Sequence, residues 1–151
     1  MSTPLPRHIL VPHDFSDTAQ NALSFALDLA SQLGARVTLV HAYEVPTYAY
    51  PDGVAVTTDL IGNIEQAATT ALAGVAARAE RPGVEIRTVL RQGTPWSEIN
   101  ATAKDVHADL IVMGTHGRQG LAHALLGSVA EKIVRTAPCP VLTVHAPARS
   151  S

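Results

Sequence analysis

The sequence predicts an open α/β fold, in which a five-stranded parallel sheet carries helices on both faces. Five short apolar runs alternate along the chain with four segments whose apolar residues recur at helical spacing. Apolar runs of this length are typical of parallel strands that are buried on both sides. For the strand order 3-2-1-4-5, the expected ligand site lies between the first and fourth strands, where the strand order reverses.

Length and composition restrict the class further. The 151 residues predict one domain over residues 1–146, followed by a disordered tail at 147–151. With a formal net charge of −2 and 16% charged residues, the chain lacks the basic stripe that a duplex nucleic-acid binder would show. It shows no signal peptide and no apolar run of membrane-spanning length, and Cys139 is its single cysteine. We therefore expect a cytoplasmic protein that binds neither nucleic acid nor membrane.

The first three elements form a β-α-β unit. Residues 8–12 are an apolar run that ends at a proline and predict the first strand. Ser16 can cap the next helix, whose apolar face spans residues 19–33 and which Gly34 is placed to end. Residues 36–42 are rich in β-branched side chains and predict the second strand. Because such crossovers are right-handed and join parallel strands, the sheet begins as a parallel one.

An irregular segment follows at residues 43–58 and contains all three tyrosines. A connection of this length is either functional or mobile, so it is a surface loop with half-buried tyrosines or a lid over a ligand. Apolar residues then recur at helical spacing over 60–79, and Pro82-Gly83 ends that helix. Residues 84–90 predict the third strand.

The last elements are shorter. Gly93-Thr94-Pro95 supplies a turn, a cap and a first-turn proline for a helix that runs to about Val106. Residues 109–113 predict the fourth strand, and residues 129–135 predict the last helix. Prolines flank residues 141–145, which fits a strand at the edge of the sheet because proline cannot donate to a ladder.

A glycine-rich region follows the fourth strand. Gly114, Gly117 and Gly120 lie three residues apart, and glycine permits close backbone approach and dihedrals that a side chain forbids. Ser128 and Glu131 have the spacing of a capping box at a helix start. Because free amide groups at a helix start favour anions, the region predicts a phosphate cradle. Gly120 is assigned to a turn, and Gly127-Ser128 forms the other wall of the cradle.

The spacing of these glycines resembles that of a known family. The chain lacks a P-loop and the Gly-x-Gly-x-x-Gly fingerprint, but it carries Gly114, two residues, Gly117, nine residues, and Gly127-Ser128. This pattern resembles the universal stress protein family, in its ATP-binding class. The similarity runs from the Ile9–Ser16 stretch, through the glycine region, to the Ala137–Leu142 stretch, and so covers nearly the whole chain.

The resemblance implies a Rossmann-like fold, similar to that of adenine nucleotide alpha hydrolases, and an adenine nucleotide as ligand. Pro12, His13 and Asp14 would line the base end, and Ala42 would pack against the adenine. Ribose and phosphates would be surrounded by Met113, Gly114, His116, Gly117, Gly127, Ser128 and Val129. The implied ligand is ATP, or else ADP or AMP, with Mg²⁺ or Mn²⁺ on its phosphates. A homodimer through the last strand, Val141 to His145, is also implied. Ala42 is smaller than the aliphatic residue usual in the family, which predicts looser adenine packing.

Two side chains have two interpretations each. Asp14 can bond an adenine amino group or a ribose hydroxyl, or serve as a turn residue. Arg118 can pair with a phosphate, or remain solvated at the surface. Both are kept as candidate binding residues.

The leading hypothesis is a stress-response or signalling module that binds nucleotide. The alternative is a slow ATP-hydrolysing or phosphotransfer enzyme that uses the same pocket; His116 is the only titrating candidate in the glycine loop, which holds no carboxylate. An adaptor with an empty pocket would require a broken glycine pattern, and the pattern is intact. The seven histidines lack ligand spacing, so no dedicated protein metal site is expected. Cys139 is interpreted as a small apolar filler.

Overall fold

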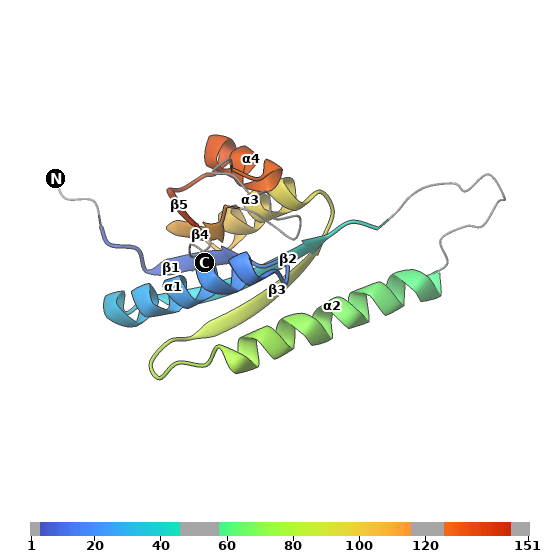
Figure 1. The fold of residues 1–151 in the computed structure, drawn as a ribbon, viewed down its shortest axis with the longest axis horizontal. Helices are drawn as coiled ribbons and strands as arrows, with labels where there is room; N and C mark the ends of the chain where they lie inside the picture. The colour runs from blue at the N-terminus through green and yellow to red at the C-terminus, as the bar shows by residue number, and fades with distance from the viewer. Residues whose placement is uncertain (1–3, 46–57, 116–125, 146–151) are drawn as a thin grey trace, which may run out of the picture.

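The computed structural model describes residues 4–45, 58–115 and 126–145, which form alternating strands and helices (Figure 1). In chain order these are β1 (His8–Pro12), α1 (Asp17–Leu33), β2 (Arg36–Tyr43), α2 (Thr58–Arg78), β3 (Ile86–Gln92), α3 (Pro95–Asp105), β4 (Leu110–Gly114), α4 (Ser128–Thr136) and β5 (Val141–Val144). The expected tail at 147–151 and most of the expected loop at 43–58, including Tyr48 and Tyr50, lie outside the described residues.

The strands form one sheet in the order β3-β2-β1-β4-β5, and all neighbouring strands are parallel. The predicted fold class and strand order are therefore confirmed. β1 lies at the centre, with β2 on one side and β4 on the other. The chain thus moves outward from β1 to β3, returns to the centre at β4, and ends at the β5 edge. This reversal between β1 and β4 creates the switch point that the sequence predicts.

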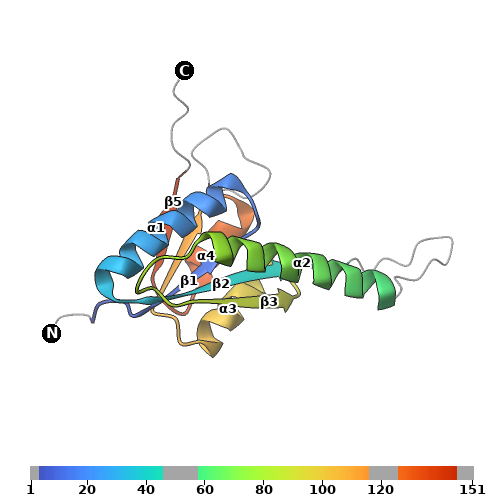
Figure 2. The same ribbon diagram turned by 90° about the horizontal axis from the view of Figure 1, so that it is seen from below.

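Helices cover both faces of the sheet. Figure 1 shows α3 and α4 above the strands and α2 below them, and Figure 2 looks onto the face that α1 and α2 cover. Residues of β1 alternate between two cores, since Ile9 and Val11 pack with α1 and α2, whereas Leu10 packs with α3 and α4. The strand is buried throughout because both of its faces are covered.

The ends of α1 follow the sequence signals. Ser16 is the N-cap, and its hydroxyl accepts a hydrogen bond from the Ala19 amide over 3.1 Å. Gly34 ends the helix at φ 67°, a left-handed conformation that glycine adopts at little cost. Both predicted caps are therefore present, and α1 is anchored where it starts beside β1.

Four strands differ in their bounds from the sequence expectation, and the smallest difference is that β5 ends at Val144 instead of His145. β3 covers residues 86–92 instead of 84–90, because Val84 donates to Arg81 in a turn and pairing with β2 continues as far as Gln92. β2 reaches Tyr43, one residue beyond the prediction, for the same reason. β4 begins at Leu110 because Asp109 serves the neighbouring strand: its Oδ2 accepts the amides of Arg7 and His8, each over 3.0 Å.

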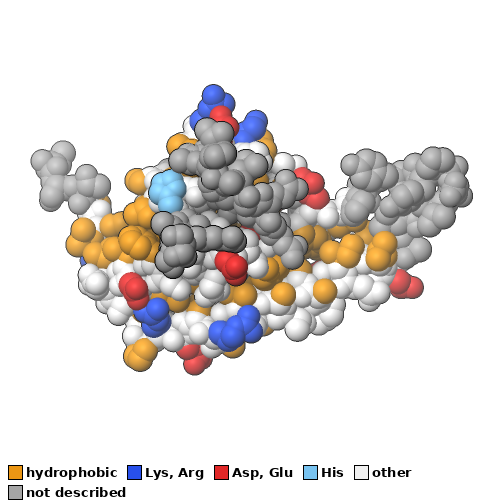
Figure 3. Space-filling view, in the orientation of Figure 1, with side chains coloured by type: hydrophobic (Ala, Val, Ile, Leu, Met, Phe, Trp, Pro, Cys, Tyr) orange, Lys and Arg blue, Asp and Glu red, His pale blue; other side chains and the backbone are white. Residues whose placement is uncertain are grey.

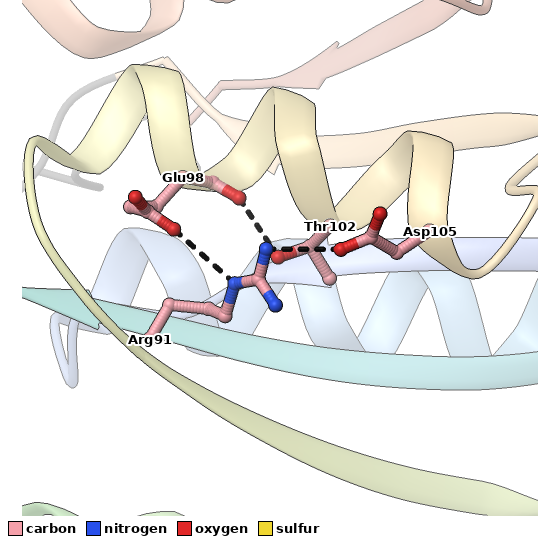
Figure 4. Close-up of polar contacts among 4 residues, drawn as sticks. All are labelled: Arg91, Glu98, Thr102 and Asp105. Carbon is pink, nitrogen blue, oxygen red and sulfur yellow. Dashed lines mark hydrogen bonds and ion pairs between the residues drawn. The ribbon is translucent and has the colours of Figure 1, made fainter.

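An arginine connects the outer strand β3 to the helix α3. Arg91 of β3 donates from Nε to Glu98 and from Nη2 to Asp105, over 3.2 and 3.0 Å (Figure 4). Both carboxylates come from α3, and the Thr102 hydroxyl on the same helix donates to the Glu98 carbonyl oxygen. The pairs are partly exposed, so each stabilises by about 1 kcal/mol or less. Their structural effect is to tie both the first turn and the last residue of α3 to β3.

The surface carries few charges in the view of Figure 3, where basic and acidic side chains lie scattered and form no extended stripe. No described helix is both long and apolar enough to cross a membrane. The helix α2 extends beyond the end of the strands in both ribbon views (Figures 1 and 2). Its buried residues accordingly begin at Ala68, and Leu60 in the first turn is 48% exposed.

Candidate functional site

The loop between β1 and α1 is shaped by its own side chains. Asp14 accepts hydrogen bonds at Oδ1 from both the amide and the hydroxyl of Ser16, the amide over 3.1 Å. His13 accepts the Phe15 amide at Nδ1 over 3.0 Å, and Phe15 adopts φ 67°. Two successive residues therefore bond backbone two positions ahead, and the loop turns sharply at the end of β1. The interpretation of Asp14 as a turn residue is confirmed.

His13 is buried and neutral in this arrangement. Its side chain is 4% exposed, and burial, the largest effect, lowers the pKa of the imidazole. Because Nδ1 accepts from the Phe15 amide, Nε2 carries the hydrogen and points toward Gln20 Oε1 at 3.4 Å. Both ring nitrogens thus face protein groups. The His13 side chain therefore forms part of the wall of the site and does not offer a free hydrogen-bond donor to a ligand.

The end of β4 contacts the first turn of α1 very closely. A Cβ placed on Gly114 would lie 2.5 Å from Thr18 Cγ2 and 3.1 Å from the Thr18 carbonyl carbon. Gly114 has no left-handed φ. The sequence predicted close ligand approach and unusual dihedrals at this glycine. The dihedral prediction is wrong, ligand approach stays a prediction, and the packing of β4 against α1 is a further reason for glycine here.

Thr115 joins β4 to the two elements that follow it. Its amide donates to the Val144 carbonyl of β5 over 3.1 Å, and its carbonyl accepts the Gly127 amide over 2.6 Å. Thr115 is 1% exposed. Backbone hydrogen bonds therefore bring the start of α4 directly to the carboxyl end of β4.

The start of α4 corrects one prediction. Gly127 is the N-cap, in extended conformation at φ −63° and ψ 162°, and no side-chain cap bond is formed. Ser128 is the first helical residue, so the expected capping box of Ser128 and Glu131 is absent: the Glu131 amide bonds the Gly127 carbonyl over 2.9 Å. Without a side-chain cap, the amides in the first turn remain available to an anion.

These segments enclose one pocket of about 470 Å³ at the carboxyl ends of the strands. Its volume lies within the range of small-molecule sites. It is lined by nine residues that the sequence singled out: Pro12, His13, Asp14, Ala42, Met113, Gly114, Gly127, Ser128 and Val129. The remaining three candidates, His116, Gly117 and Arg118, lie outside the described residues, as does Gly120. The structure therefore brings together every candidate that it describes.

Seven further lining residues were missed from the sequence: Ala19, Val40, His41, Pro95, Ile99, Thr115 and Ala130. Val40 and Ile99 belong to the apolar core under α3 and α4. Pro95 and Ile99 are four apart at the start of α3, a spacing that puts both on one helix face. This spacing could have indicated from the sequence that Pro95 and Ile99 act together, but it does not show which element their helix face contacts.

No group of three potential metal ligands among His, Cys, Asp and Glu occurs in the part of the chain that the structure describes. Asp14 is the only carboxylate among the described lining residues, and its Oδ1 is engaged by Ser16. Magnesium and similar ions are often held mainly by ligand phosphates and few protein groups. The described donor set fits an ion of that kind better than a protein-built metal centre.

Fold and pocket together define an open α/β protein with a ligand crevice at its topological switch point. Comparison with known proteins gives the family: the model of the universal stress protein family matches residues 6–145, and the chain belongs to that family. A universal stress protein of Methanocaldococcus jannaschii is 38% identical over 146 residues, which are 95% of this chain and 84% of that protein.

Solved structures agree with this assignment. A second universal stress protein of the same organism, whose biochemical function was assigned from its structure, has a TM-score of 0.81 at 28% identity; the match covers 95% of this chain and 98% of that one. A universal stress protein in complex with cAMP has a TM-score of 0.67 at 26% identity, covering 93% of this chain and 97% of that one.

Proposed function

We propose that this protein binds an adenine nucleotide, ATP in the first place, in the pocket between β1 and β4. The observation that carries the proposal is the start of α4, where the uncapped residues Ser128, Val129 and Ala130 all line the pocket. Amides at a helix start and the positive end of its dipole favour phosphate. The cAMP complex of a relative with the same fold supports an adenine nucleotide as the ligand class.

The β2 side of the pocket supplies groups suited to the base. Along β2 the Arg36 amide bonds Arg7 and the Val40 carbonyl accepts from His13, so even-numbered residues face β1. The N–H and C=O of Ala42 therefore point past the end of β1, and Ala42 lines the pocket. Adenine presents an acceptor at N1 beside a donor amino group. An adjacent backbone N–H and C=O match that pattern.

Binding without appreciable turnover fits the described residues better than catalysis. A hydrolytic enzyme needs a general base within reach of the attacking water. Asp14, the one described carboxylate that lines the pocket, is engaged by Ser16, and His13 directs both ring nitrogens to protein partners. His116 remains the candidate base of the alternative, slow-ATPase hypothesis. Phosphate release by wild type and His116→Ala decides between them: release above buffer that the variant loses would favour the enzyme.

We also infer that the functional unit is a homodimeric stress-response or signalling module that pairs through β5. This strand bonds β4 on one side and ends the sheet on the other, and all four of its residues are half-buried. An edge strand left unpaired is prone to pair with another chain. The cytoplasmic location and the single-domain boundary at 146 stay predictions from the sequence.

Native mass spectrometry of freshly purified protein tests the proposal directly. The expected spectrum shows twice the chain mass with bound nucleotide, either copurified or added as ATP with Mg²⁺. A species that stays free of nucleotide after this addition contradicts the binding proposal. A monomer that binds nucleotide contradicts the dimer alone.

A further inference from the structure

The hydrogen-bond ladder between β1 and β2 ends one bond earlier than the pattern of a parallel pair would allow. Its last bond runs from the His13 amide to the Val40 carbonyl over 2.8 Å. In a parallel ladder the next bond would run from the Ala42 amide back to the His13 carbonyl. Among the described residues, no hydrogen bond joins Ala42 to His13 or to any residue of the loop that follows β1.

The imidazole of His41 occupies that position instead. His41 Nδ1 lies 2.7 Å from the His13 carbonyl oxygen. Since a carbonyl oxygen only accepts, Nδ1 carries the hydrogen and donates it. The side chain of one β2 residue thus takes the acceptor that the backbone of the next β2 residue would otherwise use.

Neighbouring rings hold the imidazole in place. The centroid of the Phe15 ring lies 4.5 Å from that of His41, and the Tyr43 ring is stacked at 6.5 Å with an interplanar angle of 13°. Phe15 is itself fixed by the bond from its amide to His13. The orientation of His41 is therefore set by packing on two sides as well as by its hydrogen bond.

We propose that His41 is a positioning residue that determines base specificity. By donating to the His13 carbonyl it keeps the β1–β2 ladder open at Ala42, and it leaves the Ala42 N–H and C=O to a purine base. This inference rests on the proposed nucleotide-binding function. An N–H beside a C=O complements adenine N1 and its amino group, whereas guanine presents N1–H and a carbonyl in the reversed order. The N–H and C=O that Ala42 leaves unbonded to β1 therefore select adenine over guanine.

Two variants separate the hydrogen bond from the ring packing. His41→Phe keeps a ring between Phe15 and Tyr43 but loses the donor, and His41→Asn loses the ring but retains a side-chain N–H donor. Titration calorimetry with AMP and GMP measures base preference. We expect His41→Phe to bind AMP about tenfold more weakly with reduced preference over GMP, because about one hydrogen bond is lost. His41→Asn should stay within about threefold of wild type. Equal losses in both variants, or none in His41→Phe, would overturn the role of the donor.

Amide hydrogen exchange in the ligand-free protein gives a second measurement that needs no nucleotide. The Ala42 amide should exchange rapidly in wild type. In His41→Phe it should exchange more slowly, because it can then donate to the His13 carbonyl oxygen. Protection in wild type equal to that of Val40 would overturn the inference. If wild type binds no adenine nucleotide, the proposed function fails, and exchange at Ala42 still judges the hydrogen-bond argument separately.

Discussion

The amide of Gly127 donates to the carbonyl oxygen of Thr115 over 2.6 Å, so the residue just before α4 is bonded to the residue just after β4. This bond places the start of α4 at the carboxyl end of β4. Both residues line the pocket. The position of the α4 amides relative to the sheet is thus set by a backbone hydrogen bond. A side chain added here should therefore change ligand binding more than it changes the stability of the fold.

Replacing Gly127 by valine should weaken ATP binding at least tenfold with little loss of stability. The added side chain obstructs the pocket, while φ −63° and ψ 162° are accessible to valine. Loss of a favourable N-cap residue costs about 1 kcal/mol. Calorimetric titration and urea denaturation measure the two effects. Gly62→Val is the matched control on α2, because an added Cβ there meets no atom within 4 Å. Unchanged ATP affinity in Gly127→Val would remove the phosphate cradle from the proposal.

Replacing Gly114 by alanine should act on stability first. The new Cβ would meet Thr18 Cγ2 at 2.5 Å and Thr18 backbone at 3.1 Å, so β4 and α1 must separate. Overpacking of this kind costs about 1–3 kcal/mol. The double variant with Thr18→Ser removes the methyl but not the backbone contact, and we expect partial recovery in a denaturation cycle. Full wild-type stability in Gly114→Ala would disprove the packing explanation.

Asp14 should show separable roles in the turn and in binding. Asp14→Asn keeps an oxygen that can accept from Ser16, so its free energy of unfolding should stay close to that of wild type. Asp14→Ala loses that acceptor and should be less stable by about 1 kcal/mol. Both variants should bind ATP more weakly if the carboxylate contacts the ligand. Wild-type affinity in Asp14→Asn would restrict the carboxylate to the turn.

Stability should fall on mild acidification because two histidines are held neutral. Burial lowers the pKa of His8, whose Nδ1 donates to Val106 and whose Nε2 accepts from Thr38, and burial also lowers the pKa of His13. In the unfolded chain these imidazoles have a pKa of about 6.5. Below that pH the unfolded chain therefore binds more protons than the folded one. Their contribution is complete above about pH 6.5 and is lost as the pH falls through the lower folded pKa values.

Urea denaturation between about pH 7 and pH 5 measures this slope. His8→Gln should be less stable at neutral pH but show a shallower decline, since one titrating group is gone. His107→Asn, at an exposed position whose φ of 56° asparagine also tolerates, provides the control. A decline in His8→Gln as steep as that of wild type would show that other groups cause it.

The sequence predicted the sheet well because its signals are local and agree with one another. Apolar runs, the Ser16 and Gly34 caps and the prolines around β5 each specify an element without reference to distant residues. The limits of β3 could not be predicted, since they depend on pairing with β2 as far as Gln92. The pairing partner is a tertiary fact that a local pattern does not contain.

The pocket residues also divide into those that the sequence could predict and those that depend on tertiary contacts. Asp14 and Gly114 were placed together because the order of parallel strands determines which carboxyl ends meet. Ser128 was assigned the wrong cap position, because spacing alone does not reveal that Gly127 is held by Thr115. His41 was missed because its role depends on competition for one carbonyl oxygen, which only the three-dimensional arrangement shows.

Thr115 uses its amide for Val144 at the end of β5 and its carbonyl for Gly127 at the start of α4. The segment from Gly127 to Val144 is therefore held on one residue at both ends. A slip of β5 against β4 by one position would break the Thr115–Val144 bond and turn the β5 side chains to the opposite face. The pairing register of β5 thus helps to position Thr115, and with it one wall of the pocket.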